Sequence, residues 1–304
     1  MIRLKPFIDD AGFETIFRDR TELADQVVGR LNSYLESTRA STSPQGHFPP
    51  PLHDEQIWTS LLAFGYRQQP EALFKALTGV DYSGTQECQS WLEALPMSPR
   101  LGEGNSNIDL ACGALDGRGK SGIQYHPTGP VCLVEAKWNS DISGYTSHDP
   151  HRNQLARVIE NAATLQHHAP LTEKQDAKGT KPTGELPDDV YVTLLTPSVF
   201  KQKAPFSRLY AFKYWEYKLQ RYQLFADIVH QATGPRKDKG WEYPKDILHR
   251  LEKVHLRWVT FEDLFWLMPD EGFREAMAEF VQKQFAPDNP DQCLLDPKLF
   301  PGES

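Results

Sequence analysis

The sequence lacks the features of a membrane, secreted or disulfide-rich protein. No apolar run approaches the roughly 18 residues of a membrane-spanning helix, and residues 1–10 place proline and acids after a short apolar cluster, unlike a signal peptide. The four cysteines are scattered without a CxxC pair, so we predict neither a disulfide framework nor a zinc cluster. We therefore expect a cytoplasmic protein with no membrane partner.

A general excess of positive charge is also missing, since the 304 residues have a net charge of -8. This balance argues against a protein that coats nucleic acid nonspecifically. The charge is uneven, however, because residues 201–260 contain 13 Lys and Arg against 6 Asp and Glu, a local net charge of +7. A basic face of that kind is enough to hold phosphates, so the acidic total does not exclude a nuclease.

Three polar or proline-rich stretches divide the chain. Residues 38–53 and 170–188 are typical of loops, and the tail from residue 287 to 304 contains four prolines and is expected to lie extended. No internal repeat is visible. We expect an N-terminal helical segment and linker over residues 1–53, a core over residues 54–200, and a mostly helical C-terminal region over residues 201–304.

The core has the alternating pattern of an α/β protein. Residues 54–64, ended by Gly65, predict a helix. Residues 107–115 alternate like a strand, and residues 131–138 and 190–195 are dense apolar runs typical of buried strands. Between them, Asp149 and Pro150 predict the N-cap and first position of a helix extending to about residue 166. Beyond the core, we predict helices over residues 206–229 and most of residues 247–285.

Two charged residues follow the apolar run at residues 131–134. Glu135 and Lys137 are two positions apart and would therefore point to the same face of a strand. Charges in such a place are unfavourable unless they pair, meet water or bind a metal. If the strand at 107–115 pairs with this one, Asp109 converges with Glu135.

This arrangement of side chains predicts a hydrolytic metal site. Two carboxylates that converge repel each other, and a hard divalent cation such as Mg²⁺, or Mn²⁺ in its place, relieves that repulsion through oxygen ligands. We expect Asp109, Glu135 and the carbonyl oxygen of Ala136 to be the ligands. Lys137 is expected to position a water molecule or to stabilise negative charge on a phosphate.

Asp109, followed 26 residues later by Glu135-Ala136-Lys137, resembles the D…(D/E)xK signature of the PD-(D/E)XK, restriction endonuclease-like nuclease superfamily. The predicted elements from residue 54 to 196 resemble its αβββαβ core, a mixed central sheet flanked by helices. The resemblance implies a Mg²⁺-dependent nuclease acting on DNA rather than RNA, in a restriction or phage-defence setting, as a homodimer or within a larger defence complex. The sequence departs from the pattern because Ile108 replaces the proline before the acid, and no first core strand is evident between Gly79 and Gly104.

The same resemblance implies further site residues. Some branches use an acid on the first helix, where Glu55 and its neighbour Asp54 both qualify. Other branches use a glutamine on the helix after the ExK strand, which corresponds to Gln154, with Arg157 one turn later. The QxxxY pattern of one branch is absent because Val158 occupies the tyrosine position.

A basic and aromatic stretch at residues 206–225 has two interpretations. Its aromatic side chains either form a surface on which bases stack or belong to the core. Its polar side presents Lys213, Lys218 and Arg221, which we expect to contact the phosphates of a nucleic acid.

Two other functions compete with catalysis of phosphodiester hydrolysis. The first is a noncatalytic subunit that retains the nuclease fold and binds nucleic acid or a partner protein. The second is nucleotide binding by the segment from Gly113 to Ser121, which resembles a phosphate-binding loop. That segment has one residue too many between its glycines and is followed by turn-forming residues, so a hairpin loop is favoured.

Overall fold

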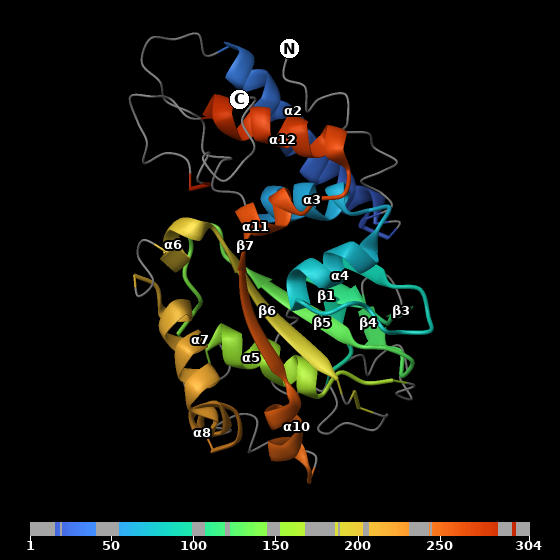
Figure 1. The fold of residues 1–304 in the computed structure, drawn as a ribbon, viewed down its shortest axis with the longest axis vertical. Helices are drawn as coiled ribbons and strands as arrows, with labels where there is room; N and C mark the ends of the chain where they lie inside the picture. Colours follow the sequence, from blue (N-terminus) through green and yellow to red (C-terminus); the bar gives the residue numbers. More distant parts are fainter. Residues whose placement is uncertain are drawn as a thin grey trace.

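The structure is a computed structural model that describes residues 16–18, 20–40, 55–98, 107–118, 122–144, 153–167, 186–187, 189–202, 207–230, 243, 245–284 and 294–295. Its centre is a seven-stranded mixed sheet with helices on both faces, as Figure 1 shows. The strand order is β3-β4-β1-β2-β5-β6-β7. Within the described residues, no helix is both long and apolar enough to cross a membrane.

The strands come from the whole length of the described chain. They are β1 (Gln89–Pro96), β2 (Ile108–Gly113), β3 (Leu115–Arg118), β4 (Gly122–Tyr125), β5 (Val131–Ala136), β6 (Val190–Thr196) and β7 (His255–Thr260). Antiparallel pairs join β1 to β2, β2 to β5 and β3 to β4. Parallel pairs join β1 to β4, β5 to β6 and β6 to β7.

The helices lie on the two faces of the sheet and at one end. One group consists of α2 (Thr21–Ala40), α3 (Glu55–Gly65), α4 (Pro70–Thr78), α11 (Phe261–Trp266) and α12 (Glu271–Gln284). The opposite face has α5 (Gln154–Ala163), α7 (Leu209–Leu219), α8 (Arg221–Phe225), the π-helix η3 (Ala226–His230) and α10 (Ile247–Lys253). The short helix α6 (Ser198–Gln202) follows β6 directly.

Strand β5 shows why the sheet is covered on both faces. Cys132 and Val134 belong to the core with α2, α3, α4, α11 and α12, whereas Val131 and Leu133 belong to the core with α5 and α7. Side chains alternate between the faces of a strand, so a strand buried on both sides appears in the sequence as a continuous apolar run.

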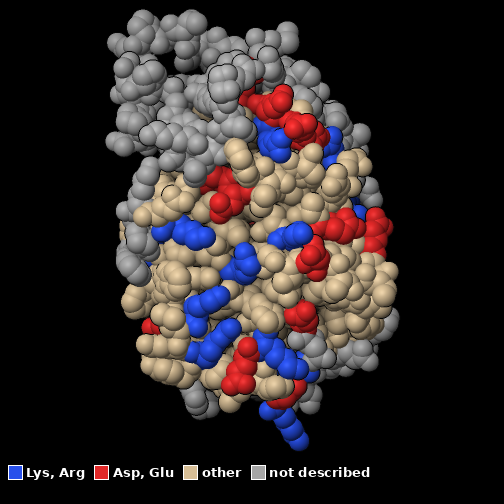
Figure 2. All heavy atoms as spheres, viewed as in Figure 1, with Lys and Arg blue, Asp and Glu red and all other residues tan. Residues whose placement is uncertain are grey.

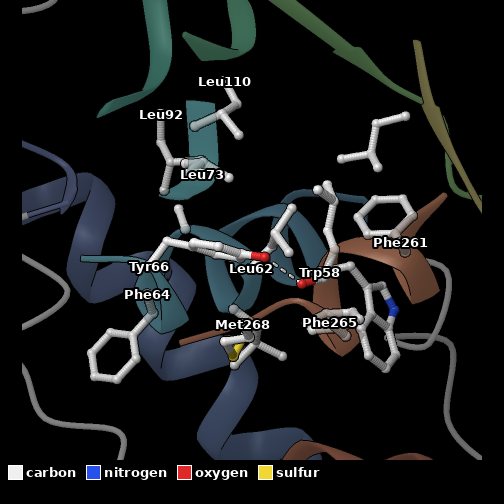
Figure 3. Packing of buried hydrophobic residues seen from close by; sticks show 14 of the residues in the cluster. Trp58, Leu62, Phe64, Tyr66, Leu73, Leu92, Leu110, Phe261, Phe265 and Met268 are labelled. Carbon is white, nitrogen blue, oxygen red and sulfur yellow. Dashed lines mark hydrogen bonds between the residues drawn. The ribbon is translucent and has the colours of Figure 1, made fainter. Parts of the chain in front are cut away.

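Trp58 anchors the end of the molecule where α3 meets α11. Its ring stacks on Trp138 at 4.4 Å between centroids and contacts the edge of Phe265 at 6.3 Å. Nearby, the Tyr66 hydroxyl donates to the Leu264 carbonyl at 2.6 Å. Figure 3 shows Trp58, Tyr66 and Phe265 among the buried side chains packed in this region. Because Trp138 follows Lys137, this packing fixes the position of the segment that leaves β5.

The structure confirms the predicted helix at the start of the core and the predicted strands β2, β5 and β6. It also supplies the missing first core strand as β1. The expected N-cap at Asp149 is wrong: α5 begins at Gln154, and the Asn153 side chain accepts from the Ala156 N–H at 3.0 Å. Asp149 and Pro150 themselves lie outside the described residues.

The prediction of a mostly helical C-terminal region missed β7. This strand pairs with β6 over six positions, so the sheet continues beyond residue 200. The segment from Gly113 to Ser121, for which we favoured a hairpin loop, contains strand β3, which pairs with β4. Short runs interrupted by glycine or placed between helices have too little periodicity to show which kind of element they form.

Candidate active site

Strands β2 and β5 bring the first two predicted site residues together. The antiparallel register pairs Leu110 with Val134, and its continuation by one residue places Asp109 opposite Glu135. Residues directly opposite in an antiparallel pair lie on the same face of the sheet. Asp109 is partly buried, and its Oδ2 accepts from the Ala136 N–H at 2.7 Å. The two carboxylates therefore lie beside each other where β5 ends.

Lys137 extends from the end of β5 into a group of oxygen atoms. Its Nζ lies 2.9 Å from Glu135 Oε1 and donates to the Ala136 carbonyl at 2.8 Å. Both side chains are buried, with 2% of Glu135 and 5% of Lys137 exposed. The ammonium thus contacts two of the three atoms predicted to bind a metal.

Glu55 joins this group from the first residue of α3. Its Oε1 accepts from Lys137 Nζ at 3.2 Å, and its Oε2 accepts from the Trp138 N–H at 2.9 Å. The competing residue, Asp54, lies outside the described residues. Glu55 therefore connects the start of α3 to the two residues that follow β5.

Burial and mutual repulsion dominate the electrostatics of the cluster. Burial raises the pKa of Asp109 well above its usual range, and the nearby Glu135 charge raises it further. Burial also raises the pKa of Glu135, although Lys137 opposes this change. Burial alone would lower the pKa of Lys137, but the carboxylates of Glu135, Asp109 and Glu55 outweigh it and raise that pKa. Lys137 is therefore a cation that keeps its proton at neutral pH and can donate hydrogen bonds.

The donor atoms fit a hard divalent cation. Glu135 Oε1 is buried, and the Lys137 ammonium at 2.9 Å is the one partner that the described residues give it. Buried carboxylates that crowd a single ammonium leave negative charge that a divalent cation would balance. No group of three or more His, Cys, Asp or Glu side chains within the described residues is arranged around a metal position. The candidate set is smaller: two carboxylates, Asp109 and Glu135, and the carbonyl of Ala136.

The two predicted residues of α5 differ in their relation to this cluster. Gln154 Oε1 accepts from the Ser143 N–H at 3.4 Å, so its side chain helps to hold the loop before α5. Arg157 is near enough to Glu135 that its charge lowers the pKa of that carboxyl. The described contacts of Gln154 therefore involve the loop, and Arg157 acts on the cluster electrostatically.

The three predicted phosphate contacts on α7 and α8 are occupied by contacts within the protein. Lys213 Nζ lies 2.7 Å from Glu216 and 2.9 Å from Asp227. Lys218 donates to the Leu256 carbonyl at 2.9 Å, and Arg221 donates to the Val254 carbonyl at 2.8 Å. Nucleic-acid binding by these side chains stays a prediction, and all three also connect parts of the fold.

Sequence reasoning missed two neighbours of the cluster. The Ser140 hydroxyl lies 3.3 Å from Glu55 Oε2, and Glu93 accepts from the Gln56 amide at 3.0 Å. Glu93 has φ of 48°, in the left-handed region that L residues rarely adopt, at the β1 position across from Asp109. No pattern in the sequence indicated either residue, because β1 was not predicted and a serine after a strand is common.

The rival phosphate-binding loop is placed between two strands of a hairpin. Gly113 ends β2, and β3 and β4 pair antiparallel on either side of residues 119–121, which lie outside the described part of the chain. Strand β4 follows this segment where a phosphate-binding loop needs the N-terminus of a helix.

Comparison with known proteins gives no relative for this chain. Neither a protein-family model, nor a curated protein, nor a solved structure matches it.

Proposed function

We propose that this protein is a metal-dependent nuclease that hydrolyses phosphodiester bonds of DNA, with the site of Asp109, Glu135 and Lys137 as its catalytic centre. The observation behind the proposal is that two carboxylates, Asp109 and the buried Glu135, face each other across paired strands beside one ammonium, that of Lys137. An excess of oxygen donors in a buried place is unfavourable in a purely structural cluster but useful for binding a cation.

The order of the elements supports a restriction endonuclease-like core. The sequence α3, β1, β2, β5, α5, β6 has the αβββαβ order, with α4 inserted before β1 and the β3–β4 hairpin inserted before β5. The proposed ligands lie on the second and third strands of this order. Fold alone does not establish activity, so the proposal depends on the side chains at the site.

In the proposed mechanism, Asp109, Glu135 and the Ala136 carbonyl would hold Mg²⁺ or Mn²⁺. When bound, such a cation supplies Lewis-acid stabilisation of the negative charge that develops on the phosphate. Lys137 is protonated and can donate a hydrogen bond to a phosphate oxygen or orient the attacking water. Glu55 accepts from both Lys137 and the Trp138 N–H and so holds the ammonium in place.

Cleavage of plasmid, linear and single-stranded DNA by the purified protein tests the proposal. We expect cutting with Mg²⁺ or Mn²⁺ and none with EDTA. Glu135→Ala and Lys137→Ala should each lower the rate by about two to three orders of magnitude, the usual effect of removing one group that stabilises developing charge. RNA substrates in the same assay would show whether DNA is preferred.

Asp227→Ala is the matched control for Glu135→Ala, because Asp227 is also a buried carboxylate paired with a lysine but lies in another part of the fold. Its cleavage rate per folded molecule should stay within a few-fold of the wild type. Cutting that survives both Glu135→Ala and Lys137→Ala would overturn the assignment of the site. A wild type that cuts no substrate would favour a noncatalytic nucleic-acid-binding role instead.

A further inference from the structure

Helix α7 has aromatic side chains on two faces. Tyr210, Tyr214 and Tyr217 point into the core, where Tyr210 and Tyr214 contact Trp258 at 6.0 and 5.4 Å between ring centroids. The other face leaves Phe212 54%, Trp215 41% and Leu219 75% exposed. One face of the aromatic stretch is therefore core, as one interpretation of the sequence predicts, and the other face is surface, where base stacking stays a prediction.

The exposed apolar residues form one continuous surface. Phe212, Trp215 and Leu219 are spaced three and four positions apart and so lie on the same side of α7. They line a shallow hollow of about 470 Å³, completed by Glu216 and Gln220. Tyr222 of α8 is 61% exposed, and its hydroxyl contacts the Gln220 side chain at 2.8 Å. We call these four residues, Phe212, Trp215, Leu219 and Tyr222, the aromatic face.

Basic side chains border the aromatic face along β7, the last strand of the sheet. Three alternate carbonyls at this edge each accept from a cation: Val254 from Arg221, Leu256 from Lys218 and Trp258 from Lys201 at 2.7 Å. Figure 2 shows Lys and Arg side chains gathered over β7 and the adjoining part of α7. These cations protect the open edge from pairing with another strand.

The basic border is a region of mutual repulsion. Burial lowers the pKa of Lys218, and the neighbouring Arg221 and Arg257 lower it further. The one acid that lines the hollow, Glu216, is neutralised by Lys213 at 2.7 Å. The surface is therefore apolar and aromatic in its centre and positively charged on one side. This combination complements a polyanion with exposed rings better than it complements another apolar protein surface.

Helix α7, which carries most of the aromatic face, begins against the loop that follows the candidate active site. Asp141, four residues after Lys137, accepts from the Leu209 and Tyr210 N–H groups at 2.6 and 3.1 Å and so caps α7. Arg208 also donates to Asn139 in the same loop. At a rise of about 1.5 Å per residue, α7 leads from this loop along the exposed surface.

We propose that the aromatic face binds single-stranded nucleic acid. Unpaired bases stack on Trp215, Phe212 and Tyr222, while Lys218 and Arg221 face the phosphates. Paired bases in a duplex cannot present their faces in this way, so the surface selects unpaired strands. If the protein is the proposed nuclease, this surface makes its preferred substrate single-stranded beside the cut, and that link rests on the proposed function. The binding itself does not require catalysis.

Binding in EDTA separates this inference from catalysis. The fluorescence anisotropy of labelled oligothymidylate, oligouridylate and a blunt duplex would be measured against the full-length protein. We expect the single strands to bind more tightly than the duplex. The affinities for oligothymidylate and oligouridylate show whether DNA or RNA is preferred. Trp215→Ala should weaken single-strand binding by at least about ten-fold, which corresponds to about 1.4 kcal/mol. Trp215→Phe should retain most of the affinity, and Trp215→Leu should lose it, because leucine is apolar but cannot stack.

Trp266→Ala is the matched control, because Trp266 is 51% exposed on α11 and outside the aromatic face. Wild-type affinity in both Trp215→Ala and Phe212→Ala would overturn the inference, as would a preference for the duplex. A wild type that binds no single strand but dimerises, and becomes a monomer on Trp215→Leu, would identify a self-association surface instead. Single-strand binding without metal-dependent cleavage would overturn the proposed nuclease and leave this inference intact.

Discussion

Two lysines of this protein are each held between two carboxylates, and the two clusters differ in the hydrogen bonds that their carboxylates accept. Lys137 lies between Glu135 and Glu55, and Lys213 lies between Glu216 and Asp227. Around Lys213, the Asp227 carboxylate also accepts from the Tyr217 hydroxyl at 2.6 Å. Around Lys137, the described residues give Glu135 Oε1 no partner other than the ammonium itself.

The comparison shows that a buried ion pair does not by itself mark a functional site. The Lys213 cluster ties α7 to η3, and the Asn153 amide extends it to the start of α5. It has the hydrogen bonds that a structural cluster needs. The Lys137 cluster adds a third carboxylate, Asp109, whose pKa is raised by burial and by Glu135. Desolvated acids that lack hydrogen bonds are retained where they bind something, which is why we place the function there.

The largest expected effect comes from removing each lysine. Lys137→Met leaves buried carboxylates without their cation, and breaking a buried pair in this way costs about 3–5 kcal/mol. Lys213→Met should cost about 1–2 kcal/mol, because Glu216 is partly exposed and Asp227 keeps its hydrogen bond from the Tyr217 hydroxyl. Urea unfolding in EDTA would measure both. Equal losses for the two variants would remove the contrast between the clusters.

A smaller effect, of opposite sign in the two clusters, is expected from replacing a carboxylate by its amide. Asp227→Asn weakens charge-assisted hydrogen bonds and should destabilise the protein by about 2 kcal/mol. Glu135→Gln removes a buried charge that repels Asp109, so stability in EDTA should be unchanged or higher. Thermal unfolding of the two variants beside the wild type gives the comparison. A loss for Glu135→Gln as large as that for Asp227→Asn would show that Glu135 is structural.

The sequence was most informative about residues whose position on a strand or helix follows from the local pattern alone. Glu135 and Lys137 were predicted because a two-residue spacing places both on one face of a strand, and Asp109 because an antiparallel partner brings it opposite. Glu55 was one of two candidates at a helix start. It accepts a hydrogen bond from the Trp138 N–H, and the other candidate, Asp54, lies outside the described residues. These are short-range inferences, each requiring at most one strand pairing.

Long-range packing was beyond the same reasoning. Strand β7 was missed because His255–Thr260 lies between helices and pairs with residues about sixty positions earlier in the chain. The partners of Lys213, Lys218 and Arg221 depend on how α7 and α8 pack against η3 and the edge of β7. A sequence shows that these residues are basic, but it does not show which carbonyl or carboxylate each one meets.

The smallest effect is expected at the β7 edge, where a cation meets a carbonyl outside both clusters. Lys218→Ala removes one hydrogen bond from a charged donor, and stability should fall by about 1 kcal/mol. Urea unfolding measures this loss. A loss of stability above about 3 kcal/mol would mean that this contact matters as much as a buried pair.

Calorimetric titration with Mn²⁺ tests most directly whether the Lys137 cluster binds a divalent cation and the Lys213 cluster does not. It would be performed on the wild type, Glu135→Gln and Asp227→Asn, since both variants change a carboxylate to an amide. The account predicts that the wild type and Asp227→Asn bind the ion alike, while Glu135→Gln binds at least about ten-fold more weakly, a difference of about 1.4 kcal/mol. Wild-type affinity in Glu135→Gln would contradict it.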